Sequence, residues 1–325
     1  MERGGFVLKK EDVSSFLEHL KKQARVIAPV QKDILRHEPL EDVNDVVFEG
    51  LSEFPYKKYF FPNDEVIFFF NRDKIDTPKL NAPKTVLFGL RMCDTAGIAV
   101  NDKLFINDYP DKAYMQRREN TYLIPIYCYH EIDQYCFCSS MDLPELFDIL
   151  FIDRQTHYHL KIGSEKGKKL FEKIHMSLKQ EDFVPPKTEC SKKLNTRDIK
   201  GIYDDQMWKT VGSDHCTSCE KCTAMCPTCL CFSIKDELND DLESGQRSIC
   251  HDSCLSKTFT LVAGNHVFRD EREFRFKHRI YHKLQYFPEK FDGMSMCTGC
   301  GRCIRSCENK IDWVNIINTV TEGKQ

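Results

Sequence analysis

The sequence predicts two domains of mixed class, an N-terminal α/β domain and a mostly helical, cysteine-rich domain after it. Apolar runs alternate with amphipathic stretches through the first 200 residues, as strands alternate with helices in α/β proteins. Beyond them, most of the 17 cysteines fall in closely spaced groups. A length of 325 residues suits two domains, each with room for a core.

The elements of the N-terminal domain can be predicted in chain order. Between Lys10 and Ile27, apolar side chains recur at intervals of three and four residues, which predicts an amphipathic helix. Buried strands are expected where apolar runs lie between polar segments. The strands expected after the first helix cover residues 45–48, 66–70, 85–90, 122–127, 149–152 and 158–162, and further helices cover 95–104 and 165–176. The chain turns polar around Pro185 and Pro186, so we place a linker there and predict domains at 1–190 and 205–325.

Eight cysteines of the second domain form two runs of one pattern. In each run, two residues separate each of the first three cysteines and three residues precede the fourth. The runs are Cys216, Cys219, Cys222 and Cys226, with Pro227 next, and Cys297, Cys300, Cys303 and Cys307. This is the spacing of bacterial ferredoxins, in which three thiolates hold one [4Fe–4S] cluster and the fourth ligates the other. We therefore predict a ferredoxin-like domain with two [4Fe–4S] clusters.

The crossed pattern assigns four ligands to each cluster. Cluster A is predicted on Cys216, Cys219, Cys222 and Cys307, and cluster B on Cys297, Cys300, Cys303 and Cys226. Residues 227–296 lie between the two motifs, so we expect a long insertion there. Structural zinc sites use separated pairs of cysteines instead of three in close sequence. A disulfide framework does not suit an odd number of cysteines in a chain without a secretory signal.

Other cysteines are candidates for further clusters. Cys93 and Cys128 each follow a predicted strand, and ligands gather beyond the carboxyl ends of parallel strands. Cys136 and Cys138 follow in a polar loop, and with the first pair they make a candidate third cluster, the alternative being buried structural thiols. A weaker candidate set is Cys229, Cys231, Cys250 and Cys254, whose members could instead pack beside cluster B. Cys190, in the linker, is expected to be a bystander.

The composition of the chain and the motifs it lacks exclude several classes of protein. The net charge of −3 argues against a nucleic-acid partner. No apolar stretch approaches the ~20 residues of a membrane helix, and reduced thiols suit the cytoplasm. Most of the basic side chains at 269–283 are expected on a solvated helix face, some near a cluster. No glycine-rich dinucleotide fingerprint or catalytic triad is present, so we expect an electron carrier that does not catalyse a reaction alone.

The chain resembles a known family of iron–sulfur proteins. The residues that carry the resemblance are 89–94, 136–139, 163–167, 226–232, 281–283 and 297–303. The family comprises the iron–sulfur electron-transfer component of anaerobic sulfite reductase and the sulfhydrogenase (nickel–iron hydrogenase) β subunit. The resemblance implies a protein that passes electrons between a flavin- and NAD(P)-binding partner and a catalytic subunit of the sulfite reductase or hydrogenase type. Met92, Cys250 and Glu308, the last in place of a proline, depart from the family pattern.

Two other functions remain open from the sequence. One is a heterodisulfide-reductase-associated electron-transfer subunit, which differs only in its catalytic partner. The other is an iron–sulfur redox sensor, which would need an effector module such as a DNA-binding helix pair.

Overall fold

The computed structural model describes residues 5–323, which form two compact units. Unit 1 contains the described residues up to Tyr56, Ala82–Lys193 and the short segment Cys297–Gly301. Unit 2 contains Lys57–Asn81, Leu194–Met296 and the described residues from Arg302 onward. Each unit is therefore assembled from three stretches of chain. The chain passes from unit 1 to unit 2 after Lys193, inside the interval between the two predicted domains.

Unit 1 is built on an eight-stranded sheet with the order β10-β1-β9-β8-β7-β6-β2-β3. Its strands are β1 (Gly5–Lys9), β2 (Arg25–Gln31), β3 (Leu35–Pro39), β6 (Thr85–Arg91), β7 (Thr121–Ile126), β8 (Ile149–Asp153), β9 (His157–Ile162) and β10 (Lys179–Glu181). The central strands β2, β6, β7 and β8 run parallel, and the remaining pairs are antiparallel. The parallel centre places the carboxyl ends of β6 and β7 side by side, because Arg91 pairs with Ile126.

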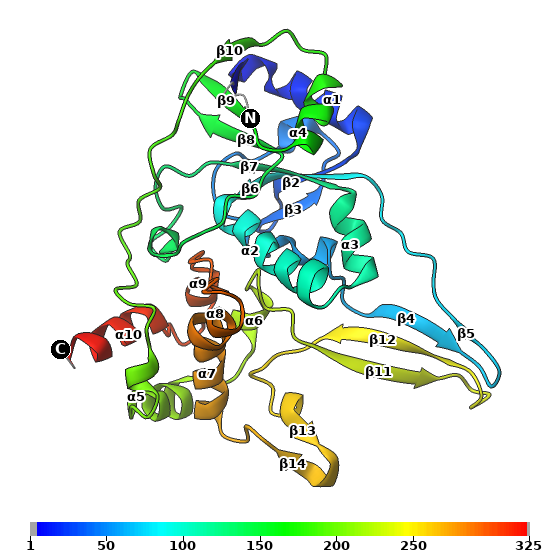
Figure 1. Cartoon of the computed structure of the whole chain (residues 1–325), viewed down its shortest axis with the longest axis vertical. Helices are drawn as coiled ribbons and strands as arrows, with labels where there is room; N and C mark the ends of the chain where they lie inside the picture. Colours follow the sequence, from blue (N-terminus) through cyan, green and yellow to red (C-terminus); the bar gives the residue numbers. More distant parts are fainter. Residues whose placement is uncertain (1–4, 324–325) are drawn as a thin grey trace. The chain divides into compact units, whose positions relative to one another are not determined.

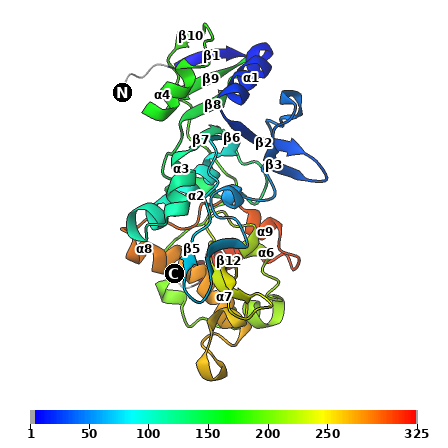
Figure 2. The same cartoon turned by 90° about the vertical axis from the view of Figure 1, so that its right-hand side faces the viewer.

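Helices cover both faces of this sheet (Figure 1). They are α1 (Val13–Gln23), α2 (Met92–Asp102), α3 (Lys112–Glu119) and α4 (Glu165–Glu172), with a π-helical turn at Lys103–Asp108. Phe16 and Leu20 of α1 and Leu170 of α4 share one core with Phe88 and Phe151 of the sheet. Helices α2 and α3 lie on the opposite side of the strands, as the view turned by 90° also shows (Figure 2). The apolar alternation in the sequence thus produces a layered α/β unit.

Most elements predicted for the N-terminal region are present, and two predictions were wrong. The strands at the other predicted positions, including β8 and β9, and helices at the predicted positions of α2 and α4 are confirmed. The predicted strand at 45–48 is absent, because a 3-10 turn at Val43–Asp45 leaves only an isolated bridge at Val46. The first helix ends at Gln23, and the apolar residues that follow belong to β2.

Unit 2 combines helices with two sheets. Its strands are β4 (Glu65–Phe70), β5 (Ile75–Asp76), β11 (Phe232–Leu238), β12 (Gly245–His251), β13 (Leu261–Val262) and β14 (His266–Val267). Its helices are α5 (Met207–Lys209), α6 (Lys221–Ala224), α7 (Arg272–Tyr281), α8 (Phe287–Lys290), α9 (Arg302–Arg305) and α10 (Trp313–Glu322), with π-helical turns at Thr210–His215 and His282–Tyr286. The larger sheet has the order β11-β12-β4-β5 (Figure 1).

This sheet differs from the expectation of a mostly helical second domain. Strand β4 comes from a part of the chain that the sequence assigns to the N-terminal domain, and it pairs with β12. Because β4 and β12 are far apart in the sequence, the residues around the cysteine runs show no periodic pattern that predicts this pairing. Within residues 5–323, no helix is both long enough and apolar enough to cross a membrane.

Candidate metal centres

The loops that carry the two cysteine runs have the same backbone pattern. Ser218 and Glu220 in the first loop have φ of 55° and 66°, and Gly299 and Gly301 at the same positions of the second have 63° and 73°. A left-handed residue at these positions turns neighbouring backbone N–H groups toward a common centre, as in anion-binding and iron–sulfur loops. Ser218 and Glu220 adopt this conformation although non-glycine residues rarely do. The shared geometry fits both loops to an anionic cluster.

A cavity in unit 2 gathers the cysteines assigned to cluster A. Its lining includes Cys216, Cys219, Cys222 and Cys307, and also Cys303, which the spacing assigns to cluster B. Cys307 comes after helix α9, in the second run, and still lies with the first three cysteines of the first run. The donor set of this cavity therefore fits the crossed arrangement of a [4Fe–4S] cluster.

Polar groups surround this cavity. The guanidinium of the buried Arg279, in helix α7, donates a 3.2 Å hydrogen bond to the carbonyl oxygen of Cys222. Burial raises the pKa of the Cys222 thiol to about 12, with Arg279 acting in the opposite direction. The backbone N–H of Ser218 lies 3.4 Å from Cys216 Sγ, and the indole Nε1 of Trp313 lies 3.4 Å from Cys303 Sγ. Donors of this kind stabilise anionic sulfur.

The four cysteines predicted for cluster B are divided between the units. Cys297 and Cys300 belong to unit 1, whereas Cys226 and Cys303 belong to unit 2. Their ligation stays a prediction from the spacing.

A further group of thiols lies in unit 2. The thiols of Cys226 and Cys229 hydrogen-bond to each other, as do those of Cys231 and Cys254. Cys254 is close enough to both Cys229 and Cys231 for their charges to raise its pKa, after the hydrogen bond and burial. Cys250 lies apart on β12, where its thiol contacts the carboxylate of Asp64. The structure thus brings three members of the weaker candidate set together with Cys226 and leaves Cys250 outside.

Buried cations face this thiol group. Lys57 Nζ donates to the carbonyl oxygens of Thr223 and Cys229 at 3.1 and 3.0 Å. Burial lowers the pKa of Lys57, while the charges of Cys229 and Cys226 raise it. Lys283 is 3% exposed, and its Nζ donates to Thr228 Oγ1 at 2.9 Å. A buried cation is costly without an anion nearby, so both lysines fit a site that becomes negative when its thiols are ligands.

Part of the basic stretch is buried. Arg275, Arg279 and Lys283 are buried, and Arg279 acts on the thiol of Cys222, as expected for the members of the stretch near a cluster. These three residues are spaced four apart, which puts them on one side of α7 and the turn after it. That spacing is the sequence pattern from which their shared burial could have been predicted. Arg275 binds the carbonyl oxygens of Leu255 and Arg269, so its role is structural.

In unit 1 a second cysteine-lined cavity lies beyond the ends of β6 and β7. Cys93, Cys128, Cys136 and Cys138 all line it, together with Cys300. The structure therefore brings together the four cysteines predicted for a third cluster. It also places Cys190, the predicted bystander, with its sulfur 3.6 Å from Cys138 Sγ.

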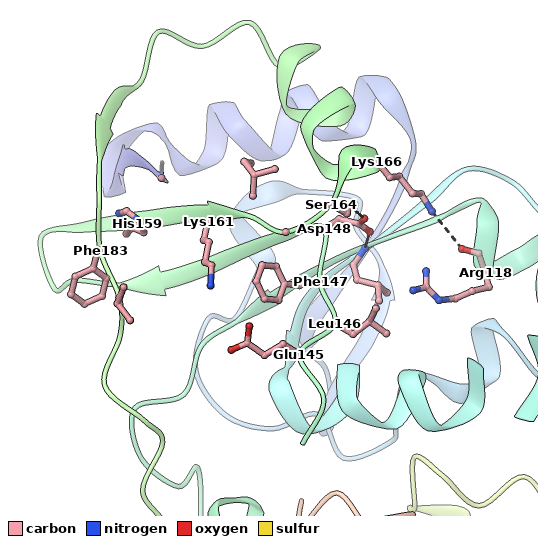
Figure 3. Close-up of a pocket in the computed structure, with 15 residues that line it drawn as sticks. Arg118, Glu145, Leu146, Phe147, Asp148, His159, Lys161, Ser164, Lys166 and Phe183 are labelled. Atoms are coloured by element: carbon pink, nitrogen blue, oxygen red, sulfur yellow. Dashed lines mark hydrogen bonds between the residues drawn. The ribbon is translucent and has the colours of Figure 1, made fainter. Parts of the chain in front are cut away.

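Another cavity of unit 1 contains no thiol (Figure 3). It has a volume of about 640 Å³ and lies beside β9 and α4. Lys161 and Glu145 point into it, with Phe147 and Phe183 on either side. Lys166, at its edge, donates to the carbonyl oxygen of Thr121 at 2.6 Å. No cysteine of the described residues lines this cavity, so it is separate from the candidate metal centres.

None of the 17 cysteines, all within the described part of the chain, forms a disulfide. Among residues 5–323, no group of three or more His, Cys, Asp or Glu side chains is arranged to hold a single metal ion.

These sites define an iron–sulfur protein of the dicluster class. A family model described as a 4Fe-4S dicluster domain matches residues 215–311, which contain both cysteine runs. The chain is also 32% identical over 335 aligned positions to sulfhydrogenase 2 subunit beta of Pyrococcus furiosus, covering 97% of this chain and 98% of the relative. The chain therefore belongs to the sulfhydrogenase β-subunit family, and the resemblance predicted from its motifs is confirmed.

Proposed function

We propose that this protein is the iron–sulfur electron-transfer subunit of a cytoplasmic oxidoreductase complex. Electrons would pass through it between a flavin- and NAD(P)-binding partner and a catalytic subunit of the nickel–iron hydrogenase or sulfite reductase type. The relative from P. furiosus carries the name of a sulfhydrogenase subunit, which supports a place in a larger complex. The observation that carries the proposal is the matched backbone of the two cysteine loops, with left-handed φ at Ser218 and Glu220 and at Gly299 and Gly301.

The spacing supports the ligand assignment of both clusters, and the cavity in unit 2 supports that of cluster A. We assign cluster A to Cys216, Cys219, Cys222 and Cys307, and cluster B to Cys297, Cys300, Cys303 and Cys226. When bound, each [4Fe–4S] cluster supplies a one-electron carrier. The protein holds the thiolates, provides N–H donors and sets the local charge, and all three influence the reduction potential.

Charge around the thiols supports a role in electron transfer. Arg279 in α7 and Lys283 in the turn after it are each 3% exposed. The charge of Arg279 acts on Cys222 of the cluster A cavity, and both charges act on Cys226 of the further thiol group. Cations at such positions stabilise the more negative, reduced form and raise its potential.

The test separates electron transfer from catalysis. The reconstituted chain, kept without oxygen, should not oxidise NADPH alone, because the sequence contains no dinucleotide fingerprint. Adding the flavoprotein partner should allow NADPH to bleach the cluster absorbance. Dithionite provides the control, since it should reduce the clusters without a partner. Robust NADPH oxidation by the chain alone would refute the proposal.

A further inference from the structure

We propose that unit 1 holds an additional [4Fe–4S] cluster whose ligands are Cys93, Cys128, Cys138 and Cys190. Two clusters belong to the dicluster domain that spans residues 215–311, and this site lies on other cysteines. The proposal keeps three of the cysteines expected from the sequence and replaces Cys136 with Cys190. The proposed cluster would be a further electron carrier in the same protein. Only this role of the cluster, and not its presence, rests on the proposed function.

The contacts of Cys138 select the fourth ligand. Its Sγ lies 3.6 Å from that of Cys190. That contact and burial raise the pKa of Cys138, and the neighbouring Cys93 and Cys128 raise it further. Burial raises the pKa of Cys128, and the charge of Cys190 raises it further. Cys138 is therefore within reach of the charges of the other three thiols, and Cys128 is also within reach of the charge of Cys190.

Cys136 faces a different set of atoms. Its Sγ lies 3.7 Å from a carboxylate oxygen of Asp133 and 3.9 Å from the carbonyl oxygen of Cys300. Cys136 lines the cavity, but its sulfur is directed toward the second cysteine loop.

Three separate segments position the four sulfurs. The parallel pairing of β6 and β7 puts Cys93 and Cys128 beyond adjacent strand ends. The third segment, which carries Cys190, is tied down by two hydrogen bonds. Thr188 Oγ1 donates to the carbonyl oxygen of Cys128 at 2.6 Å, and the backbone N–H of Cys190 donates to Ser139 Oγ at 3.2 Å.

The surroundings favour a negatively charged occupant. Arg91, 5% exposed, lies beside Cys128 and lowers the pKa of that thiol against the effect of burial. Cys93 is the second residue of helix α2, so its sulfur lies at the positive end of an eleven-residue helix. A buried guanidinium and a helix N-terminus together offset the charge of four thiolates.

The proposed site also lies beside the second cysteine loop. Cys300, a predicted ligand of cluster B, lines the same cavity. The backbone N–H of Phe137 donates to the carbonyl oxygen of Gly299 at 2.8 Å, so the two loops are in direct contact. A carrier bound here would therefore lie next to the loop segment that carries Cys297 and Cys300.

The experiment compares iron and acid-labile sulfide in full-length proteins after anaerobic reconstitution. Relative to the unaltered chain, the double variant Cys138→Ala/Cys190→Ala should lose about four irons and about four sulfides per chain. Cys190→Ala alone should give a changed electron paramagnetic resonance spectrum. Cys136→Ala should retain the full iron content, as should Cys250→Ala, a matched control whose thiol contacts Asp64 instead of another cysteine. Signals of the dicluster domain persisting in the double variant would show that it still folds.

Three outcomes would overturn the proposal. Iron content unchanged in the double variant would show that unit 1 binds no cluster. Loss of about four irons from Cys136→Ala but none from Cys190→Ala would assign the fourth ligand to Cys136. A Cys138–Cys190 disulfide in the iron-loaded protein, found by mass spectrometry, would exclude both as ligands. In each case the iron of the dicluster domain remains, so the proposed function is tested separately.

Discussion

Gly299 and Cys138 are packed so closely that no side chain fits between them. A Cβ on Gly299 would lie 2.6 Å from both the Cα and the backbone nitrogen of Cys138. Gly299 also has φ of +63°, which L-residues with side chains rarely adopt. This contact joins the second cysteine loop to the loop that carries Cys136 and Cys138, and the two residues in contact both belong to unit 1.

Gly299→Ala should therefore destabilise unit 1. The positive φ costs about 1 kcal/mol for alanine, and the backbone contact adds about 1–3 kcal/mol. Gly293→Ala is the matched control, because Gly293 has φ of +79° and open space around its Cβ position. Chemical denaturation under anaerobic conditions would measure both. Equal loss of stability in the two variants would show that the contact with Cys138 contributes nothing.

Cys307→Ala should remove a ligand of cluster A, because Cys307 lines the cavity of the first cysteine run. We expect the loss of one set of cluster signals, with about four fewer irons per chain. Cys226→Ala should affect the other set, by the crossed spacing. Electron paramagnetic resonance of the reduced proteins distinguishes the two. If each variant damages only the cluster of its own run, the crossed assignment is wrong.

Lys283→Met should lower the reduction potential of the cluster that Cys226 ligates. The buried ammonium raises that potential by stabilising added negative charge, and its charge already lowers the pKa of Cys226. Lys277→Met, in the preceding helix α7, is the control, since its ammonium lies over the Tyr203 ring. Redox titration followed by spectroscopy measures the shift. A potential unchanged by Lys283→Met, or changed equally by Lys277→Met, would contradict this role.

Glu308→Gln should raise the potential of cluster A. Glu308 lines that cavity and forms an exposed ion pair with Lys221. Removing the carboxylate leaves the positive charge of Lys221 unbalanced, and a positive charge stabilises the reduced cluster. Lys221→Gln should lower the potential, because it leaves the negative charge of Glu308 unbalanced. Both shifts should shrink as salt is added, because exposed charges are screened. Shifts of the same sign in the two variants would disprove the electrostatic explanation.

The sequence by itself determined the class of the protein and most of the fold of unit 1. Cluster ligands repeat at short intervals because one loop must surround several irons, so Cys216, Cys219 and Cys222 are recognisable without a structure. Buried strands are short apolar runs, which is why the strands that precede Cys93 and Cys128 were predicted correctly. Both signals are local, and local patterns are what a sequence displays directly.

Only the tertiary structure decided which distant side chains meet. It placed Cys190 beside Cys138, 52 positions away, and left the sulfur of Cys136 near Cys300. It brought Lys57 to the carbonyl oxygen of Cys229 across 172 positions. Such contacts form when strands pair and loops close over long separations, so they depend on the packing of the whole unit. A single cysteine or lysine in the sequence carries no sign of the partner that this packing gives it.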